Sequence, residues 1–156
     1  MRVRGFTLVE MLVTLALIAL IVAMAAPVYS LIQTRHKEAE LSENLRTIRL
    51  AIDAYKTAAT EHRIAVSPDT SGYPPNLNVL WQGVSDITRA DQRKLYFLRS
   101  LPRDPFYPDP LTPADQTWAQ RAYASPPEAP QPGEDVYDVH SMSPDTGLNG
   151  VPYRHW

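Results

Sequence analysis

A long apolar segment near the N-terminus is the strongest feature of the hydropathy pattern. From Phe6 to Ile32 the chain carries one charged side chain, Glu10, in 27 residues. At about 1.5 Å of rise per residue, a helix of that length extends about 40 Å and can cross a hydrocarbon core about 30 Å thick. The pattern therefore predicts a transmembrane helix over residues 6–32.

Beyond this segment, apolar residues recur at intervals of three and four positions, which places them on one face of a helix. The pattern predicts that the helix continues over residues 33–62 and buries this face against the rest of the protein. A coiled coil is the alternative interpretation, but fewer than four clean heptads are present. The predicted buried face consists of Leu41, Leu45, Ile48, Ile52 and Tyr55, with Ala51 and Ala58 beside them.

Pro27 lies inside this long predicted helix. Proline has no backbone N–H, so it removes one helical hydrogen bond and bends or loosens the turn that precedes it. A kink near Pro27 is therefore expected.

The remaining residues, 63–156, are expected to form a globular head. A turn-rich connection over residues 67–75 precedes a second predicted helix over Thr88–Ser100. Two short strands are predicted over Trp118–Ser125 and Asp135–Ser141, separated by a proline-rich turn, and they would form a small antiparallel sheet. The expected fold class is α+β, with a long N-terminal helix packed against this sheet.

Composition and charge argue against several functions. The 156 residues include 15 Lys and Arg against 17 Asp and Glu, so the net charge of -2 gives no electrostatic footprint for nucleic acid. The chain has no cysteine, so no disulfide holds the fold. Its four histidines fit no metalloprotease, nucleophile-elbow or phosphate-loop motif. We expect no nucleic-acid partner and no enzymatic activity, and we interpret Asp138 and His140 as part of a solvated polar strand face.

A secretory signal peptide is one alternative for the N-terminus, because basic residues, an apolar run and small residues near position 25 follow one another. The apolar run is long for that purpose. It also contains Glu10, and a charged side chain at the bilayer centre costs about 3 kcal/mol. A glutamate kept at this position indicates a specific partner.

The order of Arg2 and Arg4, then Gly5-Phe6-Thr7-Leu8-Val9-Glu10 and a long apolar helix, resembles the processing signal of the type IV pilin superfamily. This superfamily comprises type IV pilins and the pseudopilins of type II secretion. The resemblance implies that a prepilin peptidase removes residues 1–5 by cutting between Gly5 and Phe6, and methylates the new amine of Phe6. The membrane helix would stay in the mature protein, with a locally unfolded stretch near Pro27 in an assembled filament.

Cleavage would place a cationic amine on Phe6, about one helical turn from the Glu10 carboxylate. The pair can form within one chain or, where helices pack with an axial offset, between Glu10 of one chain and the Phe6 amine of the next. Breaking a buried pair on one side costs about 3–5 kcal/mol, so such a pair sets the registry of packed helices. A glutamate that reaches water among the headgroups is the alternative.

Two later segments resemble the major pseudopilin of type II secretion systems. Residues 101–106 (LPRDPF) are similar to its LPxDPW segment, and residues 135–145 are similar to its GEYDIFSLGADG segment. The resemblance implies a structural subunit that assembles with copies of itself and with other pseudopilins into a periplasmic filament. An assembly platform and its ATPase would extract the subunits from the inner membrane.

In that interpretation the protein spans the bacterial inner membrane once, with its N-terminus cytoplasmic before cleavage and its head in the periplasm. The alternative is a type IV pilin of a surface pilus that serves adhesion, twitching or DNA uptake. Surface pilins commonly carry a C-terminal cysteine pair, so the lack of cysteine favours the secretion function.

The family resemblance also implies a calcium loop near the C-terminus. Asp145 matches the first aspartate of that loop, and Asn149 is a weak substitute for the acidic pair that follows it in the family. Calcium takes six to eight oxygen ligands, usually with more than one carboxylate. A loop closed without metal, by Gly147 and Gly150 and by packing of Tyr153 and Trp156, is the alternative.

Overall fold

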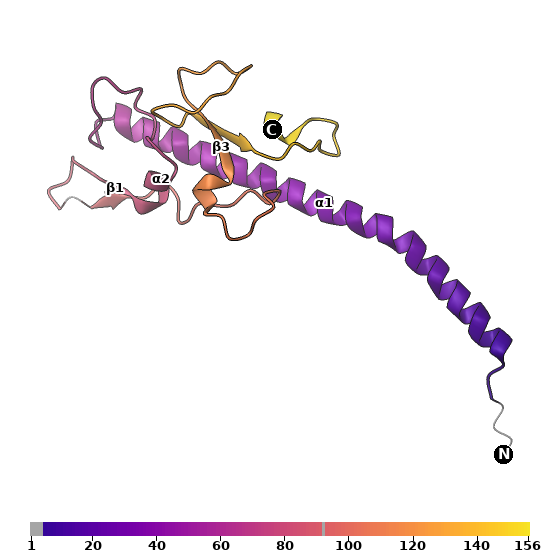
Figure 1. Cartoon of the computed structure of the whole chain (residues 1–156). Helices are drawn as coiled ribbons and strands as arrows, with labels where there is room; N and C mark the ends of the chain where they lie inside the picture. The colour runs from indigo at the N-terminus through magenta and orange to yellow at the C-terminus, as the bar shows by residue number, and fades with distance from the viewer. Residues whose placement is uncertain (1–4, 92) are drawn as a thin grey trace. The chain divides into compact units, whose positions relative to one another are not determined.

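The computed structural model describes residues 5–91 and 93–156, with the backbone alone at residues 24–27. The chain forms two compact units, one up to His36 and the other from Lys37 to Trp156. Helix α1 supplies the first unit and continues into the second. In its described residues the second unit also contains a short α-helix, two 3-10 turns, four short strands and long connecting loops (Figure 1).

Helix α1 extends from Leu8 to Thr60, which confirms the long predicted helix. The helix is continuous through Pro27 in this single chain. Local unfolding near Pro27 was expected only in an assembled filament, and it stays a prediction. The helix ends two residues before the predicted end because His62 has a left-handed φ of 55°. The Arg63 amide then donates to the Ala58 carbonyl at 2.9 Å, which is the bonding pattern of a helix C-terminal cap.

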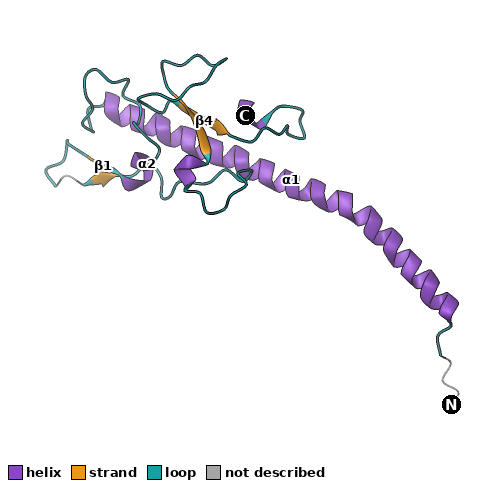
Figure 2. Cartoon of the chain, in the orientation of Figure 1, coloured by secondary structure: helices purple, strands orange, loops and turns teal. Residues whose placement is uncertain are grey.

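The C-terminal half of α1 forms one wall of the hydrophobic core. All seven residues of the predicted apolar face are buried there, and they pack against Leu77, Leu80, Trp118 and Val139. Figure 2 shows the strands and loops of the second unit gathered along this half of the helix. The three-and-four spacing therefore identified the buried face correctly, because the rest of the head covers one side of the helix.

The predicted helix over Thr88–Ser100 is wrong. The structure instead has helix α2 over Asn78–Gln82, followed by strands β1 (Val84–Ser85) and β2 (Lys94–Leu95), which pair as an antiparallel hairpin.

Two local features explain the hairpin. Gly83 has a φ of 77°, which ends α2 without the strain that a side chain would bring. Asp86 then accepts hydrogen bonds from the backbone and the hydroxyl of Thr88, at 3.0 and 2.5 Å, which favours a turn over a helix.

The second sheet confirms the strand pair predicted near the end of the chain. Strand β3 (Trp118–Arg121) runs antiparallel to strand β4 (Asp138–Ser141), and Trp118 is paired with Ser141. Both strands are shorter than predicted because the backbone bonds elsewhere from one residue after β3 and from two residues before β4. The Ala122 amide donates to the carbonyl of Gln131, and the Val136 amide donates to that of Pro74.

The LPRDPF segment anchors both of these strands. Asp104 is 2 % exposed, and its carboxylate accepts hydrogen bonds from the Ser141 hydroxyl at 2.5 Å and from the Phe106 amide at 2.8 Å. The Asp104 amide donates to the Thr117 hydroxyl at 3.2 Å. This buried carboxylate has its oxygens satisfied, so the segment has a structural role in the head.

Candidate functional site

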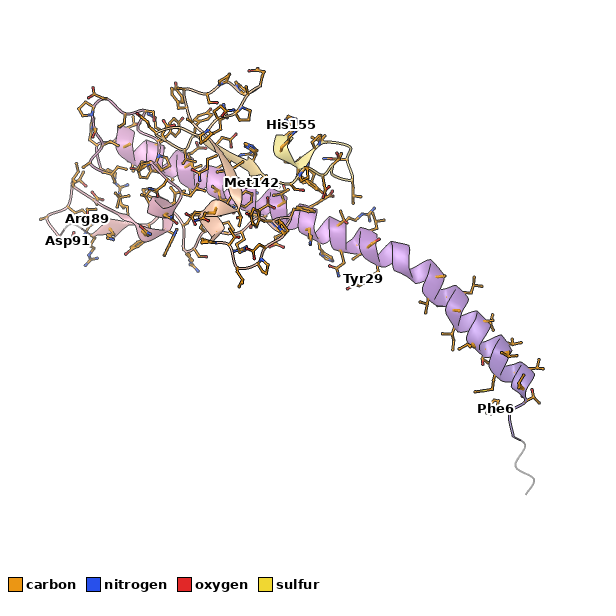
Figure 3. The ribbon with its side chains drawn as sticks, viewed as in Figure 1. Phe6, Tyr29, Arg89, Asp91, Met142 and His155 are labelled. Atoms are coloured by element: carbon orange, nitrogen blue, oxygen red, sulfur yellow. The ribbon has the colours of Figure 1, made fainter. Side chains whose placement is uncertain are left out.

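The N-terminal part of α1 presents its apolar side chains to the surroundings. Phe6 is 83 % exposed, and each large apolar side chain described between Leu8 and Ile32 is exposed as well. Figure 3 shows these side chains, from Phe6 to Tyr29, projecting outward around the helix. The helix is long and apolar enough to cross a membrane, by length and composition. Its exposure is explained if lipid or the apolar helices of other copies cover it.

Thr7 and Glu10 form a capping box at the start of α1. The Glu10 amide donates to the Thr7 hydroxyl oxygen at 3.2 Å, while the Glu10 carboxylate accepts from the Thr7 amide at 2.9 Å. The Thr7 hydroxyl also donates to that carboxylate, at 3.0 Å. These bonds satisfy two of the amides that every helix leaves unpaired at its N-terminus.

The capping box gives Glu10 a partner before any cleavage. In the uncut chain the Phe6 nitrogen belongs to a peptide bond, so Thr7 supplies the hydrogen bonds that hold the carboxylate. Sequence reasoning missed Thr7, although a threonine three residues before a glutamate at the start of an apolar run is a known signal of a capping box. Arg2 and Arg4 of the expected leader lie outside the described residues.

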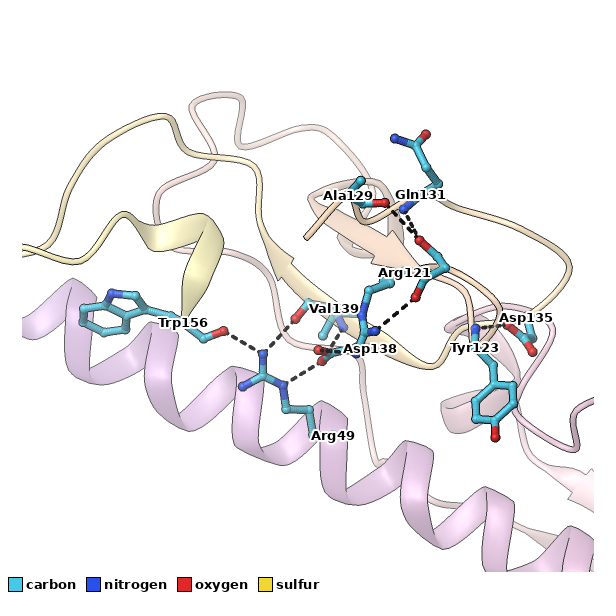
Figure 4. A network of polar contacts seen from close by, with 10 residues as sticks. Arg49, Arg121, Tyr123, Ala129, Gln131, Asp135, Asp138, Val139 and Trp156 are labelled. Carbon is cyan, nitrogen blue, oxygen red and sulfur yellow. Dashed lines mark hydrogen bonds and ion pairs between the residues drawn. The ribbon is translucent and has the colours of Figure 1, made fainter. Parts of the chain in front are cut away.

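Arg49 ties α1 to the end of the chain. Its guanidinium donates to the Asp138 carboxylate at 2.8 Å, to the Val139 carbonyl at 3.2 Å and to the Trp156 backbone oxygen at 2.7 Å (Figure 4). Arg121 approaches the other Asp138 oxygen at 3.6 Å. Because the guanidinium offers several donors in one plane, a single helix side chain holds both β4 and the segment after it.

Asp138 and His140 share one face of β4, as predicted from their alternation, while Val139 and Ser141 are buried on the other. Burial lowers the pKa of His140 below its ordinary value. Asp138 opposes this shift, while the positive charges of Arg121, Arg49 and His155 add to it. The arrangement favours a neutral imidazole in the folded head.

We expect the head to lose stability through His140 as the pH falls. The pKa of His140 is lower in the folded chain than in the unfolded one, so its contribution is present above about pH 6.5 and is lost as the pH falls below that value. A His140→Gln variant should lose less stability between pH 7.5 and pH 5 than the wild type. Melting temperatures across this range, with exposed His36→Gln as the control, measure the difference.

An identical pH profile for the wild type and His140→Gln would contradict this expectation. A change in the slope for His36→Gln alone would contradict it as well, because that side chain lies outside the second unit.

The structure places Asp145 and Asn149 in one loop near the end of the chain. The Asn149 side-chain oxygen accepts the Val151 amide at 2.9 Å, and the Asp145 carbonyl accepts the Tyr153 amide at 3.1 Å. Across residues 5–91 and 93–156, no group of three or more histidine, cysteine, aspartate or glutamate side chains is placed to hold a metal ion. Calcium binding stays a prediction.

Sequence reasoning also missed Glu38, which reaches this loop from α1 and accepts the Leu148 amide at 2.6 Å. Its position among the polar residues of a helix carries no local signal. The contact spans 110 residues of sequence, so only the tertiary structure reveals it.

The start of the chain matches a known family motif. Residues 1–26 match the prokaryotic N-terminal methylation motif, which is typical of type IV pilin-like proteins. No curated protein and no solved structure matches the chain. The motif and the α+β architecture, with a long apolar N-terminal helix and small antiparallel sheets, are both consistent with a pilin-like protein.

Proposed function

We propose that this chain is a pseudopilin, a structural subunit of the periplasmic filament of a type II secretion system. The observation that carries the proposal is the N-terminal methylation motif at the start of helix α1. This helix is apolar and exposed in the first unit of the chain, and it packs against the head in the second unit. A subunit of this kind is held by lipid before assembly and by neighbouring helices after it.

The proposed mechanism begins with cleavage between Gly5 and Phe6 at the cytoplasmic face of the inner membrane. The new Phe6 amine, once methylated, keeps its positive charge, and the membrane helix is retained. Apolar contacts between helices then supply most of the affinity for assembly, while the amine of one subunit and Glu10 of its neighbour set the axial offset. The growing filament would push substrates toward an outer-membrane channel.

The Thr7 hydrogen bonds indicate what holds Glu10 before the filament assembles. Before assembly Glu10 is held within its own chain, so its charge is partly compensated while the subunit waits in the membrane. Transfer of the carboxylate to a neighbouring amine exchanges neutral donors for a cationic one, which adds the attraction between opposite charges to a hydrogen bond.

Two features favour a secretion filament over a surface pilus. The LPRDPF segment, which is similar to the major pseudopilin, places the buried Asp104 between β4 and Thr117, the residue that precedes β3. The chain also lacks the cysteine pair with which surface pilins commonly close their C-terminal region. A surface type IV pilin for adhesion, twitching or DNA uptake is the second candidate.

Deletion of the gene tests the choice between the two. The proposal expects loss of secreted enzymes from the medium, with twitching and surface pili unchanged, and restoration by the wild-type gene. Normal secretion together with loss of twitching or of surface pili would instead support the surface pilin. Mass spectrometry of the purified chain would show in the same strains whether it begins at a methylated Phe6.

A further inference from the structure

We propose that the Glu38 carboxylate closes the loop over residues 145–153, in place of the calcium ion that the family resemblance implies. The head would then reach its fold without a metal. This proposal concerns the second unit alone, so it stands or falls independently of the secretion function.

Glu38 makes two hydrogen bonds to this loop through one carboxylate oxygen. That oxygen accepts the Leu148 amide at 2.6 Å and the Tyr153 hydroxyl at 3.0 Å. Burial raises the pKa of Tyr153 to about 12, and the hydrogen bond and negative charge of Glu38 act in the same direction. The phenol therefore stays protonated and continues to donate to the carboxylate at physiological pH.

Several oxygens of the loop accept hydrogen bonds from nearby N–H groups of the same chain. Besides the bonds of Asp145 and Asn149 described above, the Gly147 carbonyl accepts the Gly150 amide at 2.9 Å. The Val151 carbonyl accepts both the Gly147 amide at 2.9 Å and the Trp156 indole N–H at 3.2 Å. A calcium ion would need six to eight oxygens directed at one point, and these oxygens are engaged one by one around the loop.

The hydrogen-bond donors that the loop directs at Glu38 suit a negatively charged group. Around a bound cation a loop directs carbonyl oxygens inward, whereas this loop directs an amide and a hydroxyl donor at Glu38. A carboxylate that accepts such donors forms charge-assisted hydrogen bonds, which are stronger than neutral ones. The charged group that the loop surrounds is therefore the Glu38 carboxylate of α1 and not a bound ion.

Close packing holds the carboxylate in place. At Gly147 a side chain would begin 2.7 Å from the Trp156 ring and 3.1 Å from the Glu38 oxygen, so glycine permits this approach. The Tyr153 ring stacks on Phe106 with centroids 4.1 Å apart and meets Trp156 edge-on at 5.3 Å. These contacts restrict the loop to the arrangement in which its donors meet Glu38.

Melting temperatures of the full-length chain in detergent micelles test the proposal, with near-ultraviolet circular dichroism as the readout of head packing. The wild type should melt at the same temperature in calcium chloride and in the chelator EGTA. Glu38→Ala should melt about 5 °C lower in both, because it removes two charge-assisted hydrogen bonds. Glu40→Ala, an exposed glutamate on the same helix, is the matched control and should melt like the wild type.

Two results would overturn the proposal. One is a wild-type melting temperature that falls in EGTA and recovers in calcium. The other is a Glu38→Ala chain that is as stable as Glu40→Ala. If Glu38→Ala does not fold, Glu38→Gln replaces it, because the amide keeps an oxygen acceptor but loses the charge. A partial loss of stability, the same with and without calcium, is then expected, and full wild-type stability would contradict the role of the charge.

Discussion

A chain with Glu10→Val is expected to be cleaved and methylated normally and to fail to assemble into filaments. Valine is compatible with the membrane helix, but it leaves the Phe6 amine of the neighbouring subunit without a counter-charge. Breaking one side of a buried pair costs about 3–5 kcal/mol, which corresponds to a loss of between about 10²-fold and several thousand-fold in the equilibrium at each contact. Because a filament repeats the contact at every subunit, its yield should fall below detection.

Two measurements on the same cells test this expectation. Mass spectrometry of the N-terminus reports cleavage and methylation, and cross-linking of membranes followed by size analysis reports assembly. Normal amounts of filament from Glu10→Val would contradict the registry role. Uncut precursor would show that Glu10 acts in processing instead.

Thr7→Ala is the matched control because it separates capping from charge. It removes the threonine side chain of the capping box at a cost of about 1 kcal/mol but keeps the Glu10 carboxylate. We expect assembly within a few-fold of the wild type. If Thr7→Ala abolishes filaments as fully as Glu10→Val, then Glu10 acts by capping its own helix and not by pairing with a neighbour.

Trp118→Ala is expected to be the most destabilising single truncation in the head. Trp118 is 1 % exposed, lies on β3 against α1, and donates its indole N–H to the Pro102 carbonyl at 2.9 Å. Truncation of a buried aromatic residue costs about 3–5 kcal/mol, because it loses buried area and leaves a cavity. For a chain of this size the melting temperature should fall by about 10 °C or more.

Trp81→Ala provides the comparison for the same chemical change. Trp81 lies on α2, is 40 % exposed, and donates its indole N–H to the Asn78 side chain at 3.0 Å. Its truncation should lower the melting temperature by only a few degrees, since much of the ring already contacts solvent. Equal losses for the two variants, measured by circular dichroism on the full-length chain, would contradict the assignment of Trp118 to the core.

The buried face of α1 and the pair of strands near the end of the chain were both predictable. In each case the residue pattern matched the geometry of a single helix or strand. Such a pattern depends only on residues that are close together in the sequence. The helix predicted over Thr88–Ser100 is wrong because it rested on the spacing of a few apolar residues. The turn at Asp86 and the pairing of Val84 with Leu95 instead make this segment part of a hairpin. Local side-chain bonding and strand pairing there prevailed over a weak helical pattern.

The amino-acid sequence by itself determined the features that depend on neighbours along the chain: the apolar helix and the N-terminal methylation motif. The capping box of Thr7 and Glu10 is equally local, although sequence reasoning missed it. Only the tertiary structure decided which polar groups meet across the head. Arg49 reaches Trp156 and Glu38 reaches Leu148 over separations of 107 and 110 residues. Hydrogen bonds of that kind depend on positions in space, which the packing of the whole head creates, and no local pattern encodes them.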